Sequence, residues 1–344
     1  MSASRRDFLR TLAIGGAAAA MPAGAVLAQR GGGAPAPVTI AKRRRIDVHA
    51  HFTSPKLIEV VGRQELGNFA NWTPEMALKQ MDEFGIETGM ISVPPHYDPA
   101  TVDIVARPTN EHGARVVQDY KGRFGLMAFL PLPHIDTTLK EIEYVFDTLK
   151  ADGVATYTNY GDKWIGDKYF DPVMEELNRR RAVVFTHPIS ADCCKSLMPN
   201  IGDGTIEWQT DTTRAIANVL FNGAATRYPN VRFIFSHGGG TMPYLIERFE
   251  AAARNQRMAQ YFPQGFRGSA GKLFYDTAWT SNTVAQTALK QVVPLSQIVL
   301  GTDYPARAIG DHVKGLAECG VYSAAELDKV ERENALALFP RFRT

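Results

Sequence analysis

The sequence predicts a single (β/α)8 barrel of the TIM-barrel type, in which eight parallel strands are surrounded by helices. The chain has 344 residues, of which 45% are hydrophobic and 22% are charged, so it is globular and can bury a sizeable core. Short apolar or β-branched runs alternate with longer helical patterns along most of the chain. Eight such pairs occur in about 260 residues, and a doubly wound sheet would rarely need so many.

The eight expected strands are apolar or β-branched runs, such as Val183-Val184-Phe185-Thr186 in the fifth and Phe233-Ile234-Phe235 in the sixth. In chain order we expect strands over residues 45–51, 89–93, 123–129, 153–158, 182–187, 231–237, 273–278 and 297–303. The helical patterns between them cover residues 74–84, 109–120, 137–150, 172–180, 212–228, 242–259 and 283–291. A last helix over residues 324–339 closes the barrel.

Two connections are longer than a barrel needs, one over residues 52–73 and one over residues 188–211. They follow the first and fifth strands, so both leave from the carboxyl ends, where barrel enzymes build their sites. We expect substrate specificity to depend on these two loops.

The N-terminus predicts an export signal over residues 1–28. Ser4-Arg5-Arg6-Asp7-Phe8-Leu9-Arg10 is a twin-arginine pattern, and the Ala- and Gly-rich run after it ends in a plausible cleavage triplet, Val26-Leu27-Ala28. The alternative is a membrane anchor, but the glycines and Pro22 make this run a poor spanning helix. Residues 29–44 are rich in Gly, Pro and Ala and are expected to form a linker before the barrel of residues 45–344. Twin-arginine export predicts a periplasmic location and a protein that folds, often with its metal or cofactor, before export.

Charge and cysteine content exclude several partners and frameworks. The net charge is +2, and three arginines and one aspartate lie within the predicted signal, so the remainder is neutral. Apart from Lys42 to Arg45 there is no basic run, so neither nucleic acid nor an anionic membrane is an expected partner. Cys193, Cys194 and Cys319 form no C-x-x-C pair, and we expect free thiols.

The predicted chemistry begins in the first strand, at Ile46-Asp47-Val48-His49-Ala50-His51. Residues two apart in a strand face the same side, so His49 and His51 enter the barrel mouth together. The alternative is that both rings are satisfied by backbone groups in a core. A pair at this spacing at the end of a barrel strand favours metal ligation instead.

Three more polar residues end other strands: His187 the fifth, His237 the sixth and Asp303 the eighth. The carboxyl ends of these strands meet at one mouth. Three imidazoles and a carboxylate can therefore surround one divalent ion, and a further imidazole can act as acid or base.

These motifs resemble those of the amidohydrolase superfamily, in the branch of aminocarboxymuconate-semialdehyde decarboxylase. The most specific are His49-Ala50-His51, Ser236 to Gly240, Gly301 to Pro305 and Asn334-Ala335-Leu336, and residues 158–187 and 211–215 look closest to 6-methylsalicylate decarboxylase. The resemblance implies that His49, His51, His187 and Asp303 hold one divalent ion, zinc being expected and manganese an alternative. It also implies that His237 and Asp303 are the catalytic pair.

The chain departs from the family in two places, and a further match concerns assembly. The fourth strand lacks the lysine that bridges two metals in dinuclear members, which favours one metal. Near Trp72, Asn68 stands where the semialdehyde decarboxylase has an arginine that binds the substrate carboxylate. The sequence therefore does not favour aminocarboxymuconate semialdehyde as the substrate. Arg248 matches a family arginine that enters the neighbouring subunit's site and so implies a homodimer; the alternative is an exposed helix charge.

The expected reaction is the non-oxidative decarboxylation of a small ortho-hydroxybenzoate. Asp303 would deliver a proton to the ring carbon while His237 sets its ionisation. Hydrolysis of a lactone, ester or amide is the alternative reaction, and a non-catalytic metal-binding protein is a third possibility. Weaker expectations place His96 and Trp208 at the substrate and Asp276 behind the ligands, while His112, His134 and His312 are expected to be structural.

Overall fold

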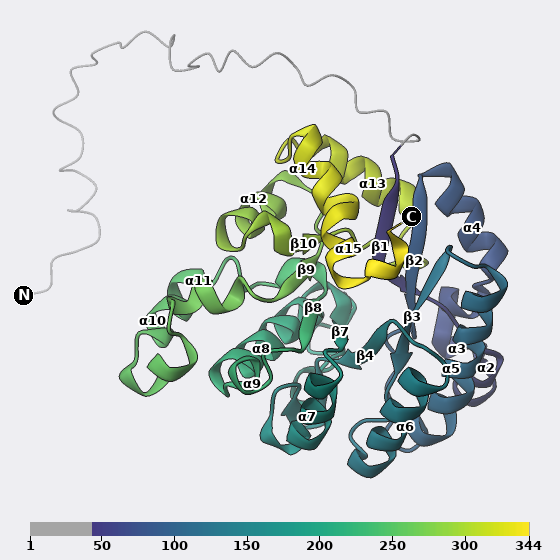
Figure 1. The fold of residues 1–344 in the computed structure, drawn as a ribbon, viewed down its shortest axis with the longest axis horizontal. Helices are drawn as coiled ribbons and strands as arrows, with labels where there is room; N and C mark the ends of the chain where they lie inside the picture. The colour runs from purple at the N-terminus through teal and green to yellow at the C-terminus, as the bar shows by residue number, and fades with distance from the viewer. Residues whose placement is uncertain (1–42, 344) are drawn as a thin grey trace, which may run out of the picture. The chain divides into compact units, whose positions relative to one another are not determined.

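The computed structural model describes residues 43–343, and its centre is one sheet of eight parallel strands. Neighbouring strands pair in chain order, with the helices packed outside them (Figure 1). The strands are β1 Arg45–His51, β2 Ile86–Ser92, β3 Phe124–Phe129, β4 Gly153–Tyr157, β7 Val183–His187, β8 Arg232–Phe235, β9 Phe274–Asp276 and β10 Ile298–Val299.

The sheet closes where the segment after β10 meets β1. The Val48 amide donates to Leu300 O at 2.8 Å, and Ala50 forms a parallel bridge with Tyr304. A side-chain hydrogen bond also joins the two segments: Asp47 Oδ2 accepts from the hydroxyl of Thr302, 255 residues away, at 2.6 Å. The strand order and this closure confirm the predicted (β/α)8 barrel.

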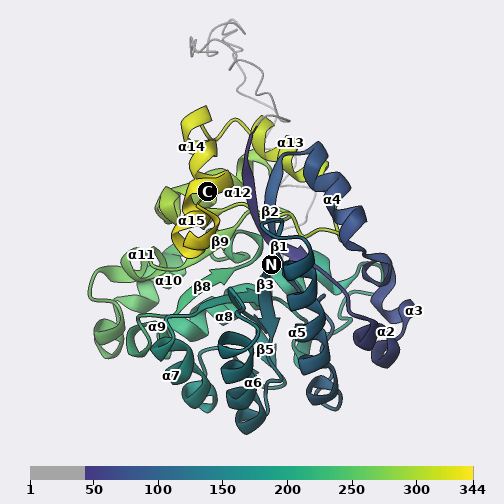
Figure 2. The same ribbon diagram turned by 45° about the vertical axis from the view of Figure 1, so that its right-hand side comes forward.

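Helices follow nearly every strand and cover the outside of the barrel (Figures 1 and 2). They are α4 Pro74–Glu83, α5 Val102–Asp119, α6 Ile135–Asp147, α7 Asp171–Arg179, α8 Glu207–Phe221, α9 Ala224–Arg227, α10 Ile246–Ala253, α11 Gly265–Ala270, α12 Thr283–Val292 and α13 Ile309–Glu318. The closing segment is α14 Ala324–Asp328, a π-helical turn Lys329–Glu333, and α15 Asn334–Leu338. Within residues 43–343, none of the helices is both long and apolar enough to span a bilayer.

Several elements differ from the sequence expectation for local reasons. The helix expected over residues 212–228 is divided into α8 and α9 at Gly223, whose φ of 73° is left-handed. Only residues 246–253 of the expected 242–259 helix are in α10, because turns precede it and a 3₁₀ segment follows. A hairpin of β5 Asn159–Tyr160 and β6 Lys163–Trp164 was not anticipated; it turns at Gly161, which has a φ of 69°.

Two of the strands that end earlier than expected precede candidate site residues. β8 ends at Phe235 and β10 at Val299, whereas the sequence pattern extends to His237 and Asp303. His237, two residues after β8, has a φ of 56°, and Asp303, four residues after β10, has a φ of 63°; a left-handed residue cannot be part of a strand. Both side chains are therefore presented by the turns just beyond the sheet.

The apolar core has two parts, one inside the barrel and one between the strands and helices. The inner part comprises residues such as Ile46, Met90, Phe185 and Ile234 and is closed at one end by the C-terminal Phe339 and Phe342. The outer part is larger and contains the apolar faces of the helices. A filled interior leaves the carboxyl ends of the strands as the place for a site.

The predicted signal of residues 1–28 and nearly all of the predicted linker lie outside the described residues. Both therefore stay predictions. The first described strand starts at Arg45, the residue at which the barrel was expected to begin.

Candidate active site

The polar residues predicted from the strand ends meet at the carboxyl end of the barrel. His49 and His51 come from β1, His187 ends β7, and His237 and Asp303 follow β8 and β10. All five side chains are at most 3% exposed. Their convergence is as predicted, although neither His237 nor Asp303 is carried by a strand.

The distances place these groups in one cluster. One ligand atom from each of His49, His187, His237 and Asp303 lies within 4.8 Å of the others. The Nε2 atom of His51 is 2.9 Å from Asp303 Oδ1 and 3.2 Å from His49 Nε2. The other carboxylate oxygen, Oδ2, is 3.3 Å from His237 Nε2. The division into four ligands and one catalytic imidazole stays a prediction, because His237 lies as close to the cluster as the others.

Hydrogen bonds outside the cluster set the tautomer of three imidazoles. His51 Nδ1 lies 2.9 Å from Val93 O, and His187 Nδ1 lies 2.8 Å from Pro188 O. His49 Nδ1 lies 2.8 Å from a carboxylate oxygen of Asp276. Carbonyl and carboxylate oxygens only accept, so each Nδ1 carries a proton and the Nε2 atom of each ring is the one that faces the cluster.

This arrangement fits a divalent cation. The Nε2 atoms of His49 and His51 lie 3.2 Å apart, and the buried His187 Nε2 has no hydrogen-bond partner among the described residues. Acceptor atoms packed this closely in a buried site need a positive charge between them. Imidazole nitrogens with one carboxylate oxygen are a donor set that suits zinc, manganese and related ions.

The electrostatics also favour a cation. Burial opposes a charge on His49, but Asp276 and Asp303 outweigh it and raise its pKa to about 10. Burial likewise opposes the charge of Asp303, yet the charge on His49 and the close contacts with His237, His49 and His51 hold its pKa well below the usual value. Burial lowers the pKa of His51 and of His187, so both rings are neutral.

Asp276, expected to lie behind the ligands, does so at the end of β9. Its Oδ2 accepts from His49, and its Oδ1 accepts from the backbone amides of His237 and Ala278, both at 2.9 Å. One buried carboxylate thus orients a ligand ring and the turn that carries His237. Such partners orient metal ligands and raise their basicity.

Two residues near the cluster were missed by the sequence analysis. The Trp279 indole donates to Asp303 Oδ2 at 2.7 Å. The ring of Phe69, from the loop after β1, lies 5.5 Å from that of His51. The signal for Trp279 is its position, three residues after Asp276 in the loop that follows a barrel strand. Nothing in the sequence distinguishes Phe69 from aromatic residues of the core.

A cleft of about 940 Å³ contains two of the weaker predictions, His96 and Trp208. It is formed by the loops after β2 and β7, which also contribute Tyr97 and Met198. Trp208 connects the cleft to the cluster, because its ring lies 5.6 Å from that of His187. The long loop after β7 therefore forms part of a cavity, in keeping with its expected role.

The remaining predicted residues lie outside the cluster. Arg248 is exposed on α10 and has no ion-pair partner among the described residues, so it does not reach this chain's own site. His312 is buried behind β9, with Nε2 3.0 Å from the Thr277 hydroxyl. The three cysteines are free thiols, as expected.

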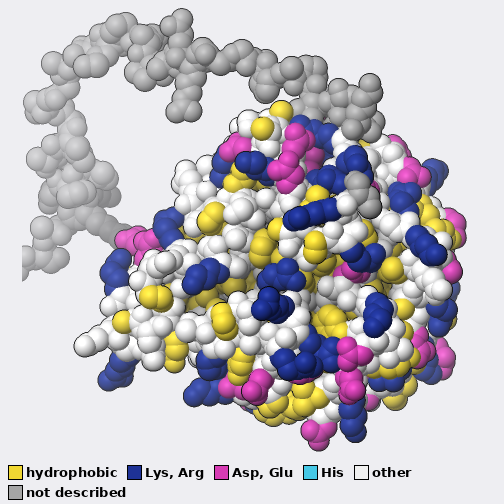
Figure 3. All heavy atoms as spheres, viewed as in Figure 1, with side chains coloured by type: hydrophobic (Ala, Val, Ile, Leu, Met, Phe, Trp, Pro, Cys, Tyr) yellow, Lys and Arg dark blue, Asp and Glu magenta, His cyan; other side chains and the backbone are white. Residues whose placement is uncertain are grey.

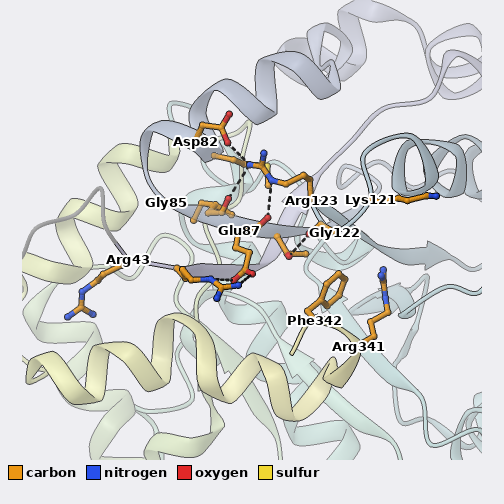
Figure 4. Close-up of a pocket in the computed structure, with 13 residues that line it drawn as sticks. Arg43, Asp82, Gly85, Glu87, Lys121, Gly122, Arg123, Arg341 and Phe342 are labelled. Carbon is orange, nitrogen blue, oxygen red and sulfur yellow. Dashed lines mark hydrogen bonds and ion pairs between the residues drawn. The ribbon is translucent and has the colours of Figure 1, made fainter. Parts of the chain in front are cut away.

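A second pocket, of about 670 Å³, lies at the opposite end of the barrel (Figure 4). Two of its positive groups are paired at the pocket, Arg44 with Glu87 and Arg123 with Asp82 at 2.7 Å. Lysine and arginine side chains also lie among aspartates and glutamates on the face shown in Figure 3. The residues lining this pocket include no histidine or cysteine, so the groups suited to chemistry are at the other end.

Sequence comparison finds relatives that cover most of the chain. The sequence profile described as Amidohydrolase matches residues 46–341. The chain is 31% identical over 324 residues to the decarboxylase yanB of Aspergillus niger, covering 87% of this chain and 88% of that protein. It is also 31% identical over 319 residues to 6-methylsalicylic acid decarboxylase of Penicillium expansum, with coverage of 87% and 97%.

A solved structure has the same fold. Dihydroxybenzoic acid decarboxylase from Polaromonas sp. JS666, with bound manganese and the inhibitor 2-nitroresorcinol, superimposes with a TM-score of 0.72. The two chains are 20% identical, and the match covers 88% of this chain and 98% of the other.

Proposed function

The chain belongs to the amidohydrolase family, as its motifs predicted, and we propose that it is a metal-dependent decarboxylase of a small ortho-hydroxybenzoate resembling 6-methylsalicylate. The observation that carries the proposal is the buried cluster, in which hydrogen bonds at Nδ1 turn the Nε2 atoms of three imidazoles toward one carboxylate and a fourth imidazole. The relatives from Aspergillus niger and Penicillium expansum, both named as decarboxylases, support the reaction class.

His49, His51, His187 and Asp303 would hold one divalent ion. Their Nε2 and carboxylate atoms suit zinc, and the manganese in the related Polaromonas structure supports that ion as the alternative. When bound, the ion would bind and neutralise the carboxylate and phenolic oxygens of the substrate.

Asp303 and His237 would manage the proton that replaces carbon dioxide. Oδ2 of Asp303 lies 3.3 Å from His237 Nε2, so the imidazole can share a proton with the carboxyl group. Protonation of the ring carbon must precede the loss of carbon dioxide. Asp303, which is ionised in the cluster, would receive a proton from His237 and deliver it to that carbon. Trp208, His96 and Phe69 would form the apolar and aromatic walls around the ring.

We also propose a homodimer and export by the twin-arginine route. Arg248 supports the first proposal, because it is exposed, has no ion-pair partner among the described residues and matches the family arginine that enters a neighbouring site. The Arg5-Arg6 motif supports the second. Sedimentation of the mature protein tests the homodimer. Detection of a tagged protein in periplasmic extract tests the export.

The activity test uses mature protein loaded with zinc or with manganese, incubated with mixed ortho-hydroxybenzoates and simple lactones and followed by mass spectrometry. We expect a hydroxybenzoate to lose the mass of carbon dioxide, and an Asp303→Asn variant to leave it unchanged. Gain of water by a lactone without any decarboxylation would refute the proposal in favour of a hydrolase. No reaction of a hydroxybenzoate with either metal would also refute the decarboxylase, leaving only the fold and the metal site.

A further inference from the structure

Backbone strain is concentrated around one carboxylate. Among the described residues, six that are not glycine have a left-handed φ, and three of them are His237, Trp279 and Asp303. These three follow β8, β9 and β10. Their side chains meet at Asp303 Oδ2, which lies 3.3 Å from His237 Nε2 and 2.7 Å from Trp279 Nε1. Residues held in sparsely populated conformations cluster where structure serves function.

Trp279 is the least expected of the three. A bulky aromatic residue is rarely found at a φ of 57°, and burial of the ring does not explain it, because Trp279 is 51% exposed. Only the indole N–H points into the buried site, where it donates to the carboxylate of Asp303, which is 2% exposed. The strained backbone therefore delivers a hydrogen-bond donor to Asp303.

The guanidinium of Arg307 packs over the face of the Trp279 indole. Its guanidinium carbon lies 5.4 Å from the centre of the Trp279 ring, and its Nη1 donates to the Ser281 hydroxyl at 3.1 Å. No carboxylate among the described residues forms an ion pair with Arg307, so its charge is directed to the ring face and the hydroxyl.

As a consequence, the two carboxylate oxygens of Asp303 have different partners. Oδ1 lies 2.9 Å from His51 Nε2 and 3.3 Å from His49 Nε2. Oδ2 accepts from Trp279 and faces His237. A free carboxylate would rotate about its Cβ–Cγ bond, and the indole N–H opposes that rotation.

We propose that Trp279 is a positioning residue, which fixes the orientation of Asp303 so that one oxygen faces the metal-binding imidazoles and the other faces His237. This inference rests on the metal centre proposed above. It does not require that the substrate be a hydroxybenzoate.

The test replaces the N–H while keeping an aromatic ring, with Trp279→Phe. The dissociation constants of zinc and of manganese are measured by competition with a chelator in purified metal-free protein. Loss of a partner behind a metal ligand typically weakens metal binding about 10–100-fold, so we expect at least a tenfold loss. Trp164→Phe is the matched control, because Trp164 Nε1 donates at 2.8 Å to Asp211 Oδ1, a buried carboxylate that is not part of the cluster. We expect the control to retain the wild-type dissociation constants.

The result that overturns the proposal is a Trp279→Phe protein that binds both metals within twofold of the wild type. An equal weakening in the Trp164 control also overturns it, since the effect would then be general destabilisation. If turnover is present, we further expect kcat to fall more than KM changes. The metal measurements need no turnover, so failure to decarboxylate refutes the proposed function without affecting this test.

A second measurement does not depend on the folding of Trp279→Phe. The chain has four tryptophans, which give four indole N–H resonances in nitrogen-15 correlation spectra. We expect one of them to shift in Asp303→Asn, because its acceptor has changed. Four unshifted resonances would overturn the proposal.

Discussion

Asp276→Asn tests whether the tautomer of His49 is set from behind the cluster. Asp276 is completely buried, and its two oxygens have separate partners. Oδ1 accepts from the amides of His237 and Ala278 at 2.9 Å, and Oδ2 accepts from His49 Nδ1 at 2.8 Å. An asparagine that keeps both amide contacts must place its own NH₂ group against the Nδ1–H of His49.

Two donors cannot share a hydrogen bond, so His49 must take the other tautomer and carry its proton on Nε2. That atom is the one that faces the cluster. The lost bond is charge-assisted and is worth about 1.5–3 kcal/mol, which corresponds to roughly a 10–100-fold loss of metal affinity. We therefore expect a metal dissociation constant raised within that range in Asp276→Asn.

The assay is chelator competition on metal-free protein, with circular dichroism to verify folding. Asp211→Asn is the control, because Asp211 is equally buried and accepts from Asn159 and Trp164, but lies outside the cluster. Asp211→Asn should lower the melting temperature and leave metal affinity unchanged. Wild-type metal affinity in folded Asp276→Asn would refute the tautomer argument.

Four further predictions concern the cluster and its support. His237→Asn should retain bound metal in elemental analysis while turnover falls about 10²–10⁴-fold, as for loss of an acid–base group; loss of the metal would instead make His237 a ligand. Dialysis against a chelator should abolish turnover, and zinc or manganese should restore it, with unchanged far-ultraviolet circular dichroism because the apolar core needs no metal. Burial lowers the pKa of His312 from 6.5 to about 3, so its contribution to stability is present above pH 6.5 and is lost as the pH falls from there toward 3. Melting temperatures of metal-free protein should therefore fall less steeply over that range in His312→Asn, and parallel curves would contradict this. Gly301→Ala should destabilise the protein by about 1–3 kcal/mol in urea unfolding and weaken metal binding, because the new Cβ would lie 2.8 Å from the Cβ atoms of His49 and Asp276. Gly89→Ala, whose nearest contact would be 3.7 Å, is its control and should be tolerated.

The sequence by itself determined the architecture and most of the cluster. Alternating strand and helix patterns predict the barrel, because hydrophobic periodicity is a local property of the chain. The period of two in Ile46 to His51 likewise places two imidazoles on one face without knowledge of any partner strand. His187, at the end of a continuous apolar run, could be placed in the same way.

Only the tertiary structure decided how these groups face one another. Left-handed backbone at His237 and Asp303, beyond the ends of β8 and β10, orients both side chains, and no strand pattern predicts such turns. The tautomer of His49 depends on Asp276, 227 residues away, and the orientation of Asp303 depends on Trp279. Closure joins β1 to the segment after β10, where Asp47 accepts hydrogen bonds from the amide and hydroxyl of Thr302. The physical reason is that a hydrogen bond requires atoms within about 3 Å and correctly oriented, and only the closed barrel brings such distant residues that close.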